Sequence, residues 1–86
     1  MRVTVHVTAS DIAKGIPLKL LLCPVARAMA RATASVWSVF YSYAMCDGSI
    51  VILPAVCHEF IVAFDSLKPV APFDFEIDLP PMHWLY

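Results

Sequence analysis

The sequence predicts an α+β domain in which four strands form one antiparallel-type sheet, with helices on one face and the chain order βαββαβ. Three observations carry this prediction. Apolar and polar residues alternate near both ends of the chain, two internal segments repeat apolar residues with a helical period, and Asp47-Gly48 separates two β-rich runs. At 86 residues the chain predicts a single domain, residues 1–86.

The first predicted strand covers residues 1–8, where Val3, Val5 and Val7 alternate with polar side chains. Thr8 stands three residues before Asp11, a spacing typical of a helix start, so a short helix is expected over residues 9–14. Gly15 would end that helix with a positive φ. Residues 16–22, IPLKLLL, are apolar without a clear period and read as a linker.

Two further helices each begin at a proline, which suits the first helical position because it has no N–H to satisfy. The helix from Pro24 carries the apolar stripe Val25, Ala28, Met29 and Ala32, with Arg27 and Arg31 on its outer side. The helix from Pro54 carries the stripe Cys57, Phe60, Ile61 and Phe64.

A hairpin lies between these helices. Asp47-Gly48 predicts a type I′ turn, which requires positive φ at both central residues. Both faces of the predicted ribbon carry large apolar side chains. On the first strand, one face holds Trp37, Val39, Tyr41, Tyr43 and Met45, and the other holds Val36, Ser38, Phe40, Ser42 and Ala44.

The last predicted strand alternates Phe73, Phe75, Ile77 and Leu79 with three acidic residues. In the ferredoxin-like arrangement of βαββαβ chains, the first and last strands are antiparallel neighbours. Arg2 and His6 would then face the acidic residues Asp74, Glu76 and Asp78. The charge of +4 on residues 1–34 and −5 on residues 35–86 favours the same pairing, or an antiparallel pairing of two subunits.

Composition narrows the class of partner. The chain is 60% hydrophobic and 15% charged, yet no stretch offers about 18 uninterrupted apolar residues, so a membrane-spanning helix is not expected. The alternating start MRVTVHVT has no basic region followed by an apolar core, so a signal peptide is not expected either. A net charge of −1 argues against nucleic acid as a partner. Three cysteines without a CxxC motif indicate a reducing compartment and hence the cytoplasm.

The doubly apolar hairpin therefore predicts an interaction site for a second copy or another protein. The residues expected to bind this partner are Trp37, Val39, Phe40, Tyr41 and Tyr43. Two alternatives stay open: the linker 16–22 or the tail 80–86 covers the second face, or the aromatic face stacks on RNA bases.

No catalytic or metal-binding pattern is evident, and no cofactor is expected. Cys57 and His58 are adjacent on a helix and do not face each other, and no Cys or His pair has zinc spacing. Lys19, Arg27 and Arg31 are candidates for contact with a phosphate or an acidic partner. They support an alternative function, a binder that sequesters a nucleotide or small ligand. An enzyme site assembled across subunits also stays open.

Several segments resemble a group of small uncharacterised proteins encoded by bacteriophages and prophages. The shared pattern is D-I-x-x-G at Asp11–Gly15, then C-P-V-A-x-A at Cys23–Ala28, then L-P-x-x-V-x-x-F-I-x-x-F-D at Leu53–Asp65, and P-F-x-F from Pro72. Cys57 stands where the third motif has valine. The resemblance implies a shared fold and a phage accessory protein that binds a host enzyme or defence component in the bacterial cytoplasm.

Overall fold

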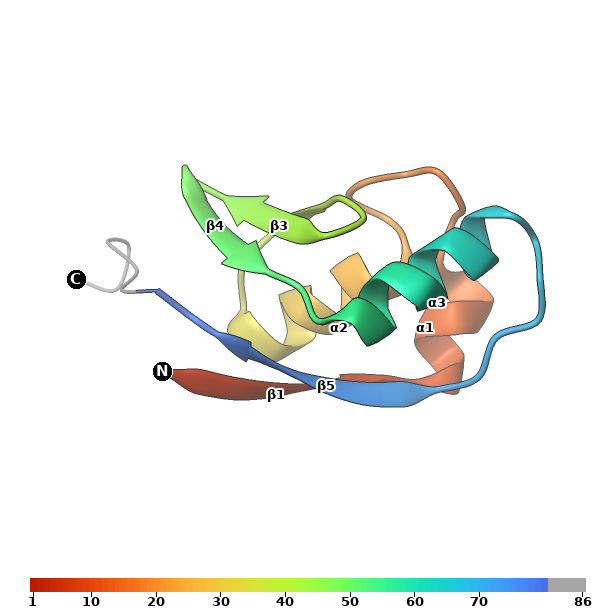
Figure 1. Ribbon diagram of the computed structural model, residues 1–86, viewed down its shortest axis with the longest axis horizontal. Helices are drawn as coiled ribbons and strands as arrows, with labels where there is room; N and C mark the ends of the chain where they lie inside the picture. The colour runs from red at the N-terminus through yellow and green to blue at the C-terminus, as the bar shows by residue number, and fades with distance from the viewer. Residues whose placement is uncertain (81–86) are drawn as a thin grey trace.

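The computed structural model describes residues 1–80, and the expectation that the tail packs against the domain falls largely on residues outside this range. Helices and strands are mixed, as the α+β prediction requires (Figure 1). The elements are β1 (Arg2–Val7), α1 (Ala9–Lys14), α2 (Pro24–Thr33), β2 (Ser38–Val39), β3 (Tyr43–Cys46), β4 (Ser49–Ile52), α3 (Ala55–Asp65) and β5 (Phe73–Asp78).

The first and last strands are antiparallel neighbours, which confirms the pairing predicted from their charges. Arg2 lies opposite Asp78, Thr4 opposite Glu76 and His6 opposite Asp74. Arg2 approaches Glu76 and Asp78 at 3.4 and 3.3 Å, and His6 Nδ1 lies 2.8 Å from the Asp74 carboxylate. These pairs are exposed, so each adds little to stability, about 0–1 kcal/mol, and mainly fixes the register.

The prediction of one four-stranded sheet is wrong. The described residues form two sheets, β1–β5 and β2–β3–β4. In addition, the expected long strand before Asp47 folds back on itself at Phe40, whose N–H donates to the Tyr43 carbonyl at 2.8 Å. The resulting strands have only two and four residues and pair with each other, Ser38 opposite Met45.

The turn between β3 and β4 is as predicted. Asp47 has φ 48° and Gly48 has φ 79°, and the flanking Cys46 and Ser49 are paired. Positive φ at both central residues matches the twist of the two strands, which is why this turn joins hairpins so often.

The short helix α1 also has the expected limits, with Thr8 as its cap. The Asp11 N–H donates to Thr8 Oγ1 at 3.2 Å, and the Thr8 N–H donates to Asp11 Oδ2 at 2.9 Å. The expected positive φ at Gly15 is wrong, because its φ is −70°. A Cβ there would stand 2.7 Å from the Pro24 ring and 2.8 Å from the Asp11 carbonyl, so the close approach of α2 explains the glycine.

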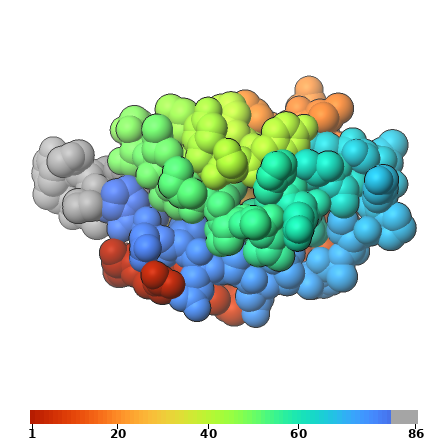
Figure 2. Space-filling view, in the orientation of Figure 1, coloured from red at the N-terminus to blue at the C-terminus, as the bar shows by residue number. Residues whose placement is uncertain are grey.

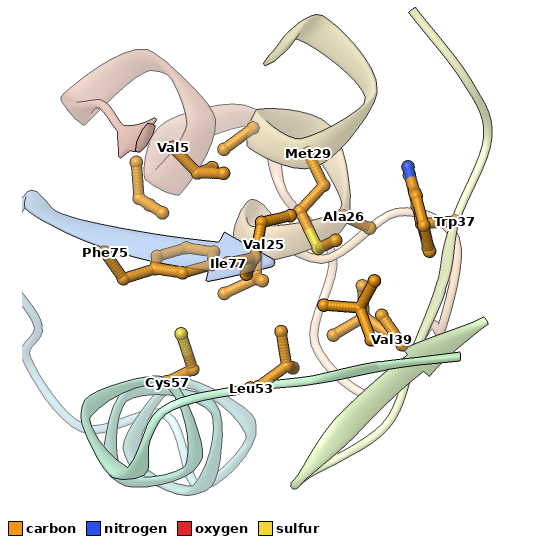
Figure 3. Packing of buried hydrophobic residues seen from close by; sticks show 14 of the residues in the cluster. Val5, Val25, Ala26, Met29, Trp37, Val39, Leu53, Cys57, Phe75 and Ile77 are labelled. Carbon is orange, nitrogen blue, oxygen red and sulfur yellow. The ribbon is translucent and has the colours of Figure 1, made fainter. Parts of the chain in front are cut away.

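The core lies between the two sheets and helices α2 and α3, and Figure 3 shows side chains from all of them pointing inward. Helix α2 buries Val25, Ala28 and Met29, while Ala32 at the end of the predicted stripe is exposed. Helix α3 buries Cys57, Phe60 and Ile61 as predicted. The two largest fully buried side chains are Trp37 and Met29.

Candidate functional site

The five residues predicted to bind a partner separate into two groups. Trp37 and Val39 are 1% and 3% exposed and belong to the core, so their assignment to an open surface is corrected. The indole N–H of Trp37 is satisfied inside the domain by Thr33 Oγ1 at 2.7 Å. Phe40, Tyr41 and Tyr43 lie at or near the surface, because the turn that begins at Phe40 changes which residues face inward.

After that turn, the core-facing residues of the second sheet are Ala44, Cys46, Val51 and Leu53. The opposite side, which we call the hairpin outer face, consists of Tyr43, Met45, Ile50 and Ile52. Ile52 is 75% exposed, and it lies opposite Tyr43 in the ladder. These four side chains are partly or fully exposed in the described part of the chain, so the sheet keeps the second apolar face that the sequence predicts.

The linker of residues 16–22 forms an ordered loop, which we call the leucine loop. The Ile16 N–H donates to the Leu22 carbonyl at 2.9 Å, and the Val39 N–H donates to the Leu20 carbonyl at 2.9 Å. Asp65 at the end of α3 accepts from the Leu18 N–H at 3.0 Å. Although the backbone is held in this way, the loop exposes five large apolar side chains: Ile16, Leu18, Leu20, Leu21 and Leu22.

A pocket of about 130 Å³ lies where the leucine loop meets the start of the β2–β3 turn and the end of α3. Its apolar lining includes Leu18, Leu20 and Phe40, and its polar groups are Lys19, Tyr41 and Asp65. The Tyr41 hydroxyl lies 3.4 Å from Asp65 Oδ2. In Figure 2 the segment around residue 40 lies between the hairpin and the α3 region on the visible face.

The pocket and the hairpin outer face are connected through aromatic side chains. Phe40, which lines the pocket, stacks on Tyr43 with ring centroids 4.7 Å apart. Tyr43 in turn neighbours Ile52 across the strands. The leucine loop, Phe40, Tyr41 and the hairpin outer face therefore form one apolar surface, and we use this name for the whole set.

The two arginines expected to contact a phosphate have a partner within the chain. Arg31 donates from Nη1 to Asp11 Oδ1 at 2.9 Å and from Nη2 to Asp11 Oδ2 at 2.7 Å, and Arg27 Nε lies 3.6 Å from Oδ1. Asp11 is fully buried, and the hydrogen bonds from Arg31 lower the pKa of its carboxyl to about 2. Lys19 lies elsewhere, in the lining of the pocket, so the structure does not assemble the expected cationic site.

The cysteines are buried and separate. Burial raises the pKa of the Cys57 thiol to about 12, and it raises the pKa values of Cys23 and Cys46. Thiols held in this protonated state are poor nucleophiles. His58 is exposed and faces Tyr41, with ring centroids 5.9 Å apart, whereas Cys57 points into the core.

None of the helices in residues 1–80 is both long and apolar enough to cross a bilayer. Nor do three or more His, Cys, Asp or Glu side chains gather in that range in a way that could hold a metal ion.

Sequence reasoning missed two features of this site. The leucine loop has no secondary-structure period, and its only signal is five large apolar residues in a segment without a predicted face. The ion pair of Asp11 with Arg31 joins residues that are 20 positions apart, which no local spacing rule detects.

The chain matches no protein-family model, no curated protein and no solved structure.

Proposed function

We propose that this protein acts by binding another protein through its apolar surface and has no catalytic activity of its own. The observation that supports this most directly is the leucine loop, whose backbone is hydrogen-bonded in place while its large apolar side chains face solvent. Contiguous exposed apolar patches on small domains mark interaction sites, because leaving them in water carries a free-energy cost.

The composition of the surface supports a protein partner. It includes the aromatic residues Phe40, Tyr41 and Tyr43, and Lys19 and Asp65 line the pocket together with Phe40 and Tyr41. Aromatic residues are enriched at protein interfaces, which also contain polar groups. The partner is a second copy of the chain or a host protein.

We also propose a biological setting for this binding. The resemblance to phage and prophage proteins supports a phage accessory protein that modulates a host enzyme or defence component in the bacterial cytoplasm. The rival function, sequestration of a nucleotide or another small ligand, was expected to use Arg27, Arg31 and Lys19. Both arginines pair with Asp11, and Lys19 lies apart from them in the pocket lining. Protein binding is therefore the function that the geometry favours.

The test compares the wild-type protein with a Leu21→Glu, Leu22→Glu variant. Each protein is immobilised and exposed to lysate of a bacterial host, and its native mass is measured by sedimentation. We expect the wild type to retain a specific protein or to self-associate, and the variant to lose this association by at least about tenfold, because a carboxylate buried in an apolar interface must be desolvated.

Val62→Glu serves as the control, because Val62 is an exposed apolar residue of α3 outside the apolar surface. The control should bind like the wild type. If the wild type stays a monomer and retains nothing that Leu21→Glu, Leu22→Glu loses, the proposed function is wrong.

A further inference from the structure

The two sheets present unpaired edges to each other at β4 and β5. The Leu53 N–H donates to the Ser42 carbonyl, so the main chain of Leu53 faces β3 and, by alternation, the main-chain groups of Ile50 and Ile52 face away from it. The Leu79 N–H donates to the Met1 carbonyl, so the main-chain groups of Glu76 and Asp78 face away from β1 in the same way. Among residues 1–80, no ladder joins the two edges.

A groove of about 380 Å³ lies between these edges. Its lining includes the side chains of Ile50, Ile52, Leu53 and Ile77, with Arg2, Glu76 and Asp78 along β5 and β1. Figure 1 shows β4 and β5 closest near the start of α3 and farther apart toward the other end of β4. The two strands therefore diverge toward the Ser49 end of β4 (Figure 1).

The groove has an acidic side. Asp74, Glu76 and Asp78 are exposed on one face of β5, and the only guanidinium beside them in the described chain is that of Arg2. Of these residues, Glu76, Asp78 and Arg2 line the groove, so its β5 wall has a net charge of −1. Such a face attracts cationic groups and disfavours anionic ones.

We propose that the groove binds an extended segment of a partner protein in which basic residues alternate with apolar ones, and that this segment adds a strand to the free edge of β4. This inference rests on the proposed function, since it names the part of the partner that the protein holds. Strand addition obtains affinity from main-chain hydrogen bonds and specificity from alternate side chains.

The side chains on the two walls explain why the outward residues are lysine or arginine. An outward residue of the added strand lies between Ile50 or Ile52 on one side and Glu76 or Asp78 on the other. Lysine and arginine suit this position because their methylene stem covers the isoleucines while the charged group reaches the carboxylates. The inward residues face Leu53 and Ile77 and are therefore apolar.

The test uses the full-length protein and a synthetic peptide of alternating valine and lysine, roughly eight residues long. Binding is measured by fluorescence anisotropy of the labelled peptide. We expect saturable binding that weakens with added salt. The double variant Glu76→Gln, Asp78→Asn should bind the peptide about fivefold to tenfold more weakly, because two cross-strand charge pairs are lost. Glu59→Gln on α3 removes an exposed carboxylate outside the groove and should change binding by less than about twofold.

Two further peptides separate strand addition from simple charge attraction. Methylation of alternate backbone nitrogens keeps every lysine but blocks the edge hydrogen bonds, so this peptide should not bind. A valine–glutamate peptide should not bind either.

Absence of binding to the full-length protein overturns the inference, including the case in which residues 81–86 or a second copy already fill the groove. Equal binding of the methylated peptide also overturns it. These results are independent of the leucine loop. If the peptide does not bind but Leu21→Glu, Leu22→Glu still abolishes association with the partner, only the groove inference is refuted. If the peptide binds but the wild type shows no association that this variant loses, only the proposed function is refuted.

Discussion

Arg31 on α2 holds the carboxylate of Asp11 on α1 with two hydrogen bonds of 2.9 and 2.7 Å, one to each oxygen. The same guanidinium donates to the carbonyl of His6 in β1 at 2.7 Å. Asp11 also caps its own helix through the Thr8 N–H. One buried carboxylate thus ties the first strand, the first helix and the second helix together.

The first prediction concerns the arginine. Arg31→Ala leaves the charge of Asp11 buried with only Arg27 nearby at 3.6 Å. Removing one partner of a buried pair is strongly destabilising because the other charge stays desolvated, so we expect a loss of about 3 kcal/mol in the free energy of unfolding. Urea denaturation followed by circular dichroism measures it.

Arg27→Ala is the matched control, since it removes a guanidinium of the same helix whose contact with Asp11 is longer. It should cost about 1 kcal/mol or less. Equal losses in the two variants would contradict the leading role of Arg31.

The second prediction concerns pH. The hydrogen bonds from Arg31 lower the pKa of Asp11 from 3.8 to about 2. Because the folded state holds the proton less tightly than the unfolded state, the stabilisation is complete above pH 4 and is lost as pH falls from 4 toward 2. The shift corresponds to about 2 kcal/mol.

The comparison is with Asp11→Asn, which has no carboxyl to titrate at this position. Unfolding measured between pH 6 and pH 2 should show a smaller loss in Asp11→Asn than in the wild type, by about 2 kcal/mol. Parallel curves for the two proteins would show that another group controls acid unfolding.

The sequence predicted the elements that depend on local signals. The strict alternation of residues 1–8 and 73–79, the helix that begins at Pro24 and the Asp47-Gly48 turn all appear where the pattern placed them. The other helix begins one residue later than predicted, at Ala55, with Pro54 as its N-cap. Each of these depends on period, capping or turn chemistry within a few residues. The opposite charges of Arg2 and Asp78 also predicted one long-range pairing.

The remaining features depend on contacts between distant parts of the chain. The turn that begins at Phe40 has no glycine, proline or asparagine, so the sequence around it was predicted as one continuous strand. The turn changes which of the following residues face inward. This one turn explains why the expected strand is divided into β2 and β3, and why Trp37 is buried while Tyr43 lies on the outer face. The arginines looked free in sequence because Asp11 lies 20 positions from Arg31.

The third prediction distinguishes the reasons for which glycine is needed at positions 15 and 48. Gly15→Ala places a Cβ 2.7 Å from the Pro24 ring although the backbone has an ordinary φ, and it should cost about 1–3 kcal/mol through overpacking. Gly48→Ala meets nothing within 4 Å, but its φ of 79° costs about 1 kcal/mol. Chemical denaturation gives both values.

Asparagine distinguishes the causes, because it tolerates positive φ better than alanine but is larger. Gly48→Asn should recover most of the stability, whereas Gly15→Asn should be at least as unstable as Gly15→Ala. Recovery at Gly15 would mean that conformation, and not the proximity of Pro24, requires glycine there.

The fourth prediction concerns the buried indole. Trp37 Nε1 donates to Thr33 Oγ1 at 2.7 Å, and this hydroxyl donates to the Met29 carbonyl at 2.7 Å. Thr33→Val leaves the indole N–H without a partner in the core and should cost about 1–2 kcal/mol. Trp37→Phe removes the donor and leaves a cavity, for about 2–3 kcal/mol. The double variant should cost about 1 kcal/mol less than the sum, because both changes remove the same hydrogen bond. Additive losses in urea denaturation would refute this coupling.

Since Trp37 lies in the core, the folded Trp37→Phe variant should keep any association that Leu21→Glu, Leu22→Glu abolishes. Loss of that association in Trp37→Phe would show that Trp37 belongs to the interface.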